Sequence, residues 1–213
     1  MKPLILSILS LLFTCSTPQS GDKKRIDTGA FSIEVPANWH YKKQSGIDSF
    51  VGIIETEHSE LHFDVSSMGY ANPLVQSEAE YIESGQWKWT PLLLAKRSEW
   101  AAATQSKLEE IQIPEDEIQR IDGRWIATLL HRDTTKTIEI EIPAEILNYT
   151  CSIDTVDGYY RKIVQPKVGI KGTTGIYIQA LNDSYNFNLW GKDLNPQEQA
   201  QAIEAFEGIQ IRR

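Results

Sequence analysis

The stretch YTCSIDTVDGYYRKIV, residues 149–164, carries the strongest fold signal in the chain. Two segments rich in β-branched and aromatic residues, 149–156 and 159–164, are separated by Asp157-Gly158. An Asp-Gly pair favours a two-residue turn, because both residues tolerate the positive φ that such a turn requires. The pattern therefore predicts a β-hairpin and an antiparallel sheet.

More strands are predicted on both sides of this hairpin. Residues 31–35 (FSIEV) alternate apolar and polar side chains and stop at Pro36, which cannot donate a ladder hydrogen bond. Trp39 follows in a turn as a predicted core residue. The other predicted strands are residues 50–55, 61–67, 124–131, 137–142, 175–181, 185–190 and 209–211. In the second of these, Leu61, Phe63 and Val65 are expected to face inward.

Helix starts are marked by capping residues. Ser77 with Glu80 forms a capping box, Thr90 precedes a proline, and Asn195-Pro196 with Glu198 combines three start signals. The second helix is expected to continue through residues 100–110, and the last to end at Gly208. Strands, helices, strands and a terminal helix predict an α+β fold, a mostly antiparallel sheet with helices packed on it, as a single domain over residues 25–213.

Composition limits the class of partner. The 213 residues are 41% hydrophobic and 23% charged, as in a globular chain, and the net charge is -8. An acidic surface repels phosphate backbones, so nucleic acid is not expected as a partner. No cofactor is predicted either.

The first residues are typical of an export signal. Lys2 precedes an apolar run, residues 4–13, that is too short to span a bilayer but fits a secretory signal. Residues 12–15 (LFTC) resemble a bacterial lipobox, although Phe13 and Thr14 depart from its usual residues. We therefore expect a signal peptide over residues 1–14 and lipid on Cys15; ordinary cleavage near this point is the alternative.

Lipid on Cys15 would set the location of the protein. Acyl chains contribute about 0.8 kcal/mol for each buried CH₂ group, and two chains hold a protein stably on a membrane. Residues 15–24 are then expected to be the lipidated N-terminus and a polar tether. By resemblance to Gram-negative lipoproteins, Ser16 favours the outer membrane. The predicted location is the cell envelope, with membrane contact through Cys15.

Three segments of the body resemble the PsbP-like superfamily: FSIEVPANW (31–39), IDGRWIATL (121–129) and DLNPQEQAQAIEAFEGIQI (193–211). The resemblance implies an antiparallel sheet sandwiched by helices. Its motifs are structural and transfer no catalytic residue. The better-known relatives bind other proteins, which favours a binding role by analogy.

A metal site is one candidate. His58, Glu60, His62 and Asp64 would share one face of an extended strand, and imidazole and carboxylate groups suit Zn²⁺. A turn within this stretch would separate the four side chains, which would then form the solvated face of a hairpin.

Two other features concern surfaces and the remaining thiol. Trp87, Trp89 and Trp100 form a candidate platform for a sugar or peptide, with core packing as the alternative. Cys151 is expected to be buried and inert.

The leading functional hypothesis is a non-enzymatic, lipid-anchored envelope module that binds a protein or glycan partner. The alternative is a metal-dependent hydrolase that uses His58 and His62. Purely structural or immunity-like inhibition of a toxin is a third possibility, which the sequence does not separate from the first.

Overall fold

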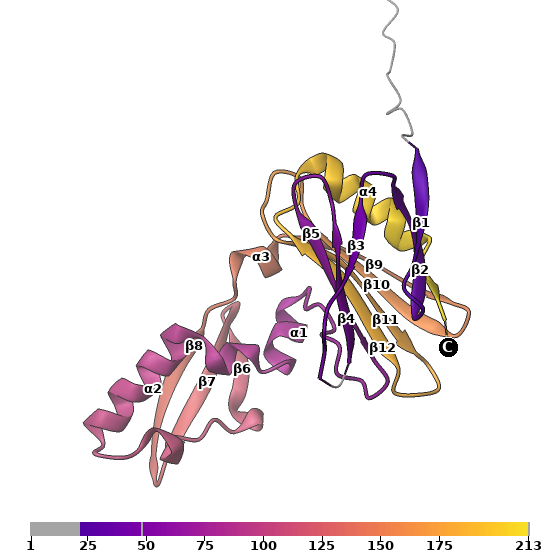
Figure 1. The fold of residues 1–213 in the computed structure, drawn as a ribbon. Coiled ribbons are helices and arrows are strands. Elements are labelled where there is room, and N and C mark those ends of the chain that lie inside the picture. The colour runs from indigo at the N-terminus through magenta and orange to yellow at the C-terminus, as the bar shows by residue number, and fades with distance from the viewer. Residues whose placement is uncertain (1–21, 48, 213) are drawn as a thin grey trace, which may run out of the picture.

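The computed structural model describes residues 22–47 and 49–212. The predicted signal peptide, Cys15 and most of the predicted tether lie outside these residues. Figure 1 shows two parts: a β-sandwich, called the body below, and a lobe formed by residues 78–147, called the insert. The insert lies between strands β5 and β9 of the body in sequence.

The body is built on an antiparallel seven-stranded sheet with the order β3-β4-β5-β12-β11-β10-β9. Its hairpin β9–β10 turns at Asp157-Gly158 and pairs Val156 with Tyr159, as predicted. The strands are β3 (His40–Lys43), β4 (Phe50–Glu55), β5 (Glu60–Ser66), β9 (Tyr149–Val156), β10 (Tyr159–Pro166), β11 (Thr173–Ala180) and β12 (Asn186–Lys192).

One face of this sheet is covered by helix α4 (Pro196–Glu207) and a small antiparallel sheet. That small sheet has the order β1-β2-β13 and consists of β1 (Lys23–Asp27), β2 (Phe31–Pro36) and β13 (Gln210–Ile211). Lys23 and Lys24 pair with Pro36 and Val35, so the last two residues of the predicted tether are strand instead. The core between these layers contains Phe31, Phe187 and Phe206, each with none of its surface exposed.

The start of α4 is fixed by a buried carboxylate. Asn195 caps the helix as predicted and accepts hydrogen bonds from the backbone N–H groups of Gln197 and Glu198. The Glu198 carboxylate accepts hydrogen bonds from the Thr56 hydroxyl, from the His58 N–H at 2.8 Å and from the Ser59 hydroxyl at 3.0 Å. Burial alone raises the pKa of this carboxyl, but these donors outweigh burial and lower the pKa below its ordinary value. The β4–β5 turn is thereby joined to α4.

The insert has its own antiparallel sheet, in the order β6-β7-β8, and its own apolar cluster. Ser77 and Thr90 cap α1 and α2 as predicted, but α2 ends at Ala103 rather than near residue 110, because Gln105 has a positive φ of 51°. The elements of the insert are α1 (Glu78–Glu83), η1 (Gln86–Trp89), α2 (Pro91–Ala103), η2 (Leu108–Glu110), η3 (Glu115–Glu117), β6 (Ile118–Ile121), β7 (Arg124–His131), β8 (Thr134–Ile140) and α3 (Ala144–Leu147).

The predicted α+β class with antiparallel sheets is confirmed, although strands predominate. The helices are distributed differently from the prediction: α4 packs on the body, while α1 and α2 pack on the sheet of the insert. Whether residues 25–213 fold as one unit stays a prediction. Among the described residues, no helix has the length and apolar character needed to cross a bilayer.

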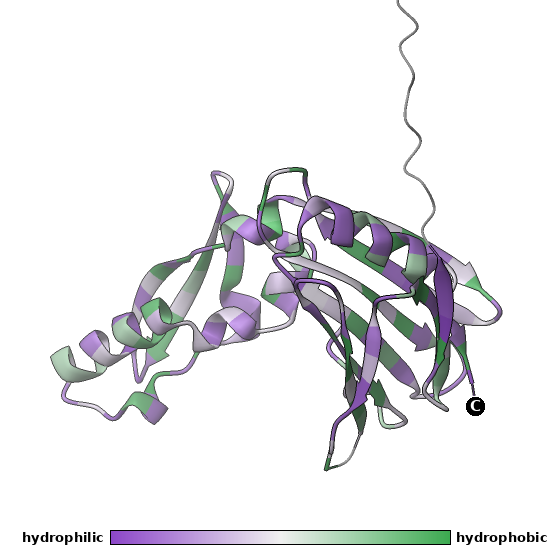
Figure 2. Cartoon of the chain, turned by 45° about the horizontal axis from the view of Figure 1, so that its top comes forward, coloured by the Kyte–Doolittle hydropathy of each residue, from purple (hydrophilic) through white to green (hydrophobic). Residues whose placement is uncertain are grey.

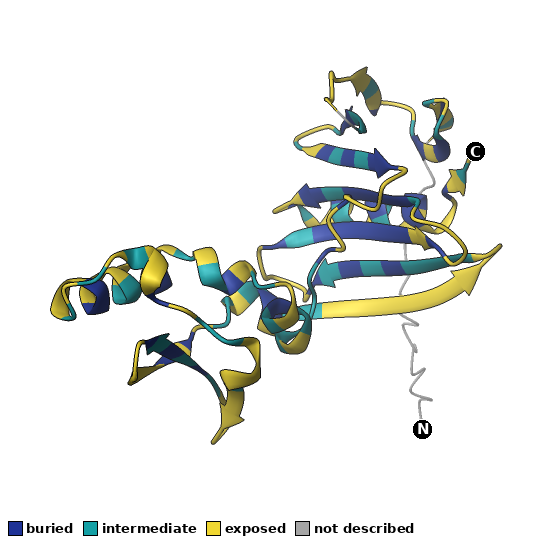
Figure 3. Cartoon of the chain, turned by 90° about the horizontal axis from the view of Figure 1, so that it is seen from below, coloured by how far each residue is buried: buried dark blue, intermediate teal, exposed yellow. Residues whose placement is uncertain are grey.

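Side chains alternate along the body strands, and Figure 2 shows this as changing hydropathy along each ribbon. Leu61, Phe63 and Val65 on β5 face the apolar core, as predicted. We call this side of the sheet the inner face and the opposite side the outer face. Figure 3 shows the molecule from below, with β9 exposed along most of its length.

Candidate functional site

A cleft of about 470 Å³ lies on the outer face of the seven-stranded sheet. Its floor is formed by β5 and β12, which pair in antiparallel register with Asp64 opposite Asn188 and His62 opposite Trp190. Its walls come from the segment 70–75, from α3 and from the first residue of β9. The cleft therefore lies where the insert leaves and rejoins the body.

Strand alternation explains why these side chains meet. Phe63 and Leu189 point into the core, so their neighbours along β5 and β12 point to the outer face. Asp64 and Asn188 consequently lie side by side, next to the pair His62 and Trp190. Segments more than 100 residues apart in sequence supply one surface.

Aromatic rings line the cleft. The rings of His62 and Trp190 stack with centroids 5.2 Å apart and an interplanar angle of 28°. Tyr70 stands at the rim with 65% of its surface exposed. The Tyr149 hydroxyl accepts a hydrogen bond from the Thr173 N–H at 3.1 Å, which holds this ring against the end of β11. Rings fixed in this way offer flat apolar surface to a ligand.

Two buried acceptor atoms in the cleft have no hydrogen-bond donor among the described residues: Asp64 Oδ1 and Asn188 Oδ1. Asn188 is 2% exposed, and its Nδ2 donates to the Asn72 carbonyl at 3.0 Å, which fixes the orientation of the amide. An unpaired buried polar atom costs about 1–3 kcal/mol. Because both atoms are acceptors, only a hydrogen-bond donor could pair with them.

The predicted metal ligands do not converge. His58 lies in the β4–β5 turn with its side chain 65% exposed, and its Nε2 is 3.8 Å from a Glu57 oxygen. Glu60 approaches His62 at 3.6 Å at the solvent-facing end of β5. Within residues 22–47 and 49–212, no three His, Cys, Asp or Glu side chains are grouped to hold a metal ion. The four predicted ligands are not brought together, because the turn removes His58 from the face that the others share.

His62 and Asp64, however, both line the cleft. The sequence pattern identified both residues, but as metal ligands. His62 contributes a ring surface through its stack on Trp190, and Asp64 contributes an unpaired acceptor.

The predicted three-tryptophan platform is not formed. Trp87 and Trp100 are 1% and 9% exposed and belong to the core of the insert, where the Trp87 indole N–H donates to the Ile82 carbonyl at 3.0 Å. Trp89 is 73% exposed and lies near Trp125 instead. Core packing explains the two buried rings, because each buries a large apolar area.

Cys151 was expected to be buried, but its side chain is exposed, so this prediction is wrong. The thiol lies on β9, where the residues after Tyr149 are exposed. β9 is the last strand of the sheet, so no neighbouring strand within the described part of the chain covers it.

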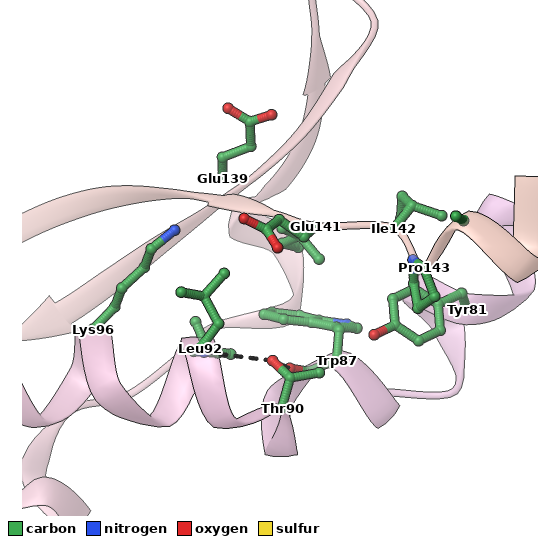
Figure 4. A pocket seen from close by; sticks show the side chains of 12 residues that line it. Tyr81, Trp87, Thr90, Leu92, Lys96, Glu139, Glu141, Ile142 and Pro143 are labelled. Atoms are coloured by element: carbon green, nitrogen blue, oxygen red, sulfur yellow. Dashed lines mark hydrogen bonds between the residues drawn. The ribbon is translucent and has the colours of Figure 1, made fainter.

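A second hollow, of about 300 Å³, lies within the insert between α2 and the end of β8 (Figure 4). The Trp87 indole forms its floor, and Tyr81 and Pro143 close one end. Thr90 accepts the capping hydrogen bond from Leu93 N–H at 3.4 Å and donates to the Trp87 carbonyl. Among the described residues, none that line this hollow holds a buried side-chain acceptor without a partner, which distinguishes it from the cleft.

Sequence reasoning did not identify Tyr70, Asn72, Tyr149, Asn188 and Trp190. One signal was present: in β12 (NFNLWGK), Asn186, Asn188 and Trp190 alternate with the core residues Phe187 and Leu189. Amides on one face of a central strand indicate a covered polar surface. The residues of β12 do not indicate which loop covers that surface.

No protein-family model matches the sequence, and no curated protein does. The chain is similar to the solution structure of cyanobacterial PsbP from Synechocystis sp. PCC 6803, at 11% sequence identity over 94% of this chain and 99% of that chain. The TM-score of this comparison is 0.33. A likeness at this level carries no argument about the cleft, whose description rests on this chain's own residues.

Proposed function

We propose that this chain is an exported, lipid-anchored binding module that holds a glycan in the cleft of the outer face. The observation that carries the proposal is the pair of buried acceptors Asp64 Oδ1 and Asn188 Oδ1, which no donor in residues 22–47 and 49–212 reaches, beside the stacked rings of His62 and Trp190.

The chemistry of a sugar matches this arrangement. A pyranose ring has an apolar C–H face, which packs on an aromatic ring, and a rim of hydroxyl groups, each of which can donate a hydrogen bond. Aromatic walls with a few placed polar groups are the usual composition of a small-molecule site. The carboxylate of Asp64 favours neutral or amine-bearing sugars over anionic ones.

The proposed anchor supplies the location. Lipid on Cys15 would keep an acidic domain at a membrane that its surface charge does not attract. The first strand of the body, β1, begins at Lys23, within the stretch 15–24 that was predicted as the tether. A short tether would keep the cleft close to the glycans of the envelope.

The test of the cleft is calorimetric titration of the full chain with two probes, chitohexaose and maltohexaose. We expect binding of at least one probe, weakened at least about tenfold in Asn188→Leu and in Trp190→Ala. Trp89→Ala is the matched control, because this exposed indole lies in the insert, and its binding should equal that of the unchanged chain. Absence of binding by both probes, or binding that both cleft variants leave intact, would contradict the proposal.

The anchor is tested separately by intact-mass analysis of the protein from its native membrane. We expect diacylglycerol on the N-terminal cysteine, loss of membrane association in Cys15→Ala, and no loss in Cys151→Ala. An unmodified thiol at Cys15 would remove the anchor from the proposal and leave the cleft unaffected.

A further inference from the structure

The two edges of the seven-stranded sheet are protected to different degrees. Edge strand β3 has four residues and carries Lys42 and Lys43, and charged side chains on a short edge discourage pairing with another chain. Edge strand β9 has eight residues (YTCSIDTV) and a single charged residue, Asp154. β9 contains no lysine, no proline and no break in its register with β10.

β9 is also bare. Within the described residues it pairs with β10 alone, and all its residues after Tyr149 are exposed (Figure 3). Ile153 is 56% exposed and Val156 is 40% exposed. A long, exposed and nearly uncharged edge is a ready template for another strand.

The β9–β10 turn identifies which backbone groups are free. The pair Val156 and Tyr159 flanks a two-residue turn, so these two residues exchange hydrogen bonds. Because hydrogen-bonded and non-hydrogen-bonded pairs alternate, Asp154 and Ser152 also bond toward β10. The N–H and C=O groups of Cys151 and Ile153 consequently point to the open edge.

We propose that β9 pairs with β9 of a second copy of this chain, antiparallel and related by a two-fold axis. Two overlaps of seven residues bring open-edge residues opposite each other, over residues 149–155 or over residues 150–156 of both copies. The first includes four open-edge residues of each copy instead of three, and it places Cys151 opposite Ile153 of the second copy. In this register Asp154 lies opposite Thr150, so no like charges meet. Asp154 is already bound by the Arg161 guanidinium at 2.8 and 2.5 Å.

The distribution of charge favours this antiparallel arrangement. The insert, residues 78–147, contains fourteen acidic and eight basic residues, a net charge of -6 out of -8 for the chain. β9 begins two residues after α3, the last helix of the insert. Antiparallel pairing therefore puts the two inserts at opposite ends of the new ladder, about 25 Å apart along an eight-residue strand. That distance exceeds the screening length of about 8 Å at physiological salt. A second copy can therefore pair with β9 while its acidic insert stays beyond the screening length from the acidic insert of the first copy.

The experiment measures the molar mass of the full chain carrying Cys15→Ser by light scattering over about a hundredfold range of concentration. We expect a concentration-dependent dimer for this chain. Ile153→Lys and Ile153→Pro should weaken dimerisation at least tenfold: lysine adds like charges to the edge, and proline removes an N–H that the fold itself does not use. Val168→Lys is the matched control, because Val168 is 97% exposed outside the sheet and the same gain of charge there should leave the dimer intact.

A cross-link gives a second readout that does not depend on the stability of the variants. In the proposed register the two Cys151 residues are diagonal neighbours on one face, about 7–8 Å apart. A short bis-maleimide should join them in solution and should fail to do so in Cys151→Ser. A chain that is monomeric at every concentration, or a dimer that both Ile153 variants leave unchanged, overturns the proposal. Neither result bears on the glycan cleft.

Discussion

The inner and outer faces of the seven-stranded sheet are made by alternate residues of the same strands, yet they differ in what covers them. On the inner face, Phe63, Phe187 and Leu189 lie under α4 and the small sheet, with at most 2% of each side chain exposed. On the outer face, the neighbouring residues Asp64 and Asn188 hold acceptor atoms for which the described part of the chain supplies no donor.

The difference shows which residues serve stability and which are held at a cost. A closed apolar face gains free energy from each buried side chain. An outer face with unpaired acceptors loses free energy, and such local conflicts are expected at functional sites. Substitutions on adjacent residues of β12 can therefore separate the two roles.

The largest effect is expected from Phe187→Ala on the inner face. The Phe187 ring is fully buried, with its centroid 4.7 Å from that of Phe31, so its removal leaves a cavity. We expect a loss of about 3–5 kcal/mol in the free energy of unfolding, measured by urea denaturation. Leu181→Ala, at a 56% exposed position of the same sheet's loops, is the control and should change this free energy little. A loss below about 1 kcal/mol in Phe187→Ala would mean that the inner face is not closed as described.

A smaller effect is expected from Glu198→Gln, which weakens the attachment of α4 to the β4–β5 turn. The loss should be about 2 kcal/mol at neutral pH, since hydrogen bonds to a charged acceptor are replaced by neutral ones. The folded-state pKa of Glu198 is lowered, so its contribution is complete above the unfolded value of about 4.3 and disappears as the pH falls through the lower folded value. Thermal unfolding at a series of pH values should show the gap between the two proteins closing in acid. A gap that is independent of pH would contradict this account.

The smallest effect on stability is expected from Asn188→Leu on the outer face. This change loses the hydrogen bond to Asn72 but also removes an unpaired buried acceptor, so the two terms oppose each other. We expect a change of less than about 1 kcal/mol in urea unfolding, together with loss of glycan binding. A large destabilisation would show that the Asn188 amide mainly stabilises the fold. The outer face would then serve stability, as the inner face does.

Much of the fold could be predicted because its signals are local. The Asp157-Gly158 turn and the caps at Ser77, Thr90 and Asn195 depend on residues within a few positions of each other. Strands β1 (Lys23–Asp27) and β3 (His40–Lys43) were missed because their polar residues show no clear alternation, and only pairing with neighbouring strands defines them.

The candidate site was less predictable. Spacing along β5 identified His62 and Asp64, but the β4–β5 turn places His58 away from the face that these two side chains share. The predicted platform of three tryptophans is not formed for a similar reason. Trp87 and Trp100 are buried against the sheet of the insert, whose strands lie later in the chain.

By itself, the sequence determined the class of fold, the hairpins, the helix starts and the acidic charge, because each follows from side chains that are near neighbours or from a sum over the chain. Only the tertiary structure decided that β5 and β12 lie side by side, that Trp190 stacks on His62 and that β9 ends the sheet with an open edge. The physical reason is that strand pairing joins residues separated by more than 100 positions. Which side chains then share a surface depends on register and strand order, and no local pattern specifies either.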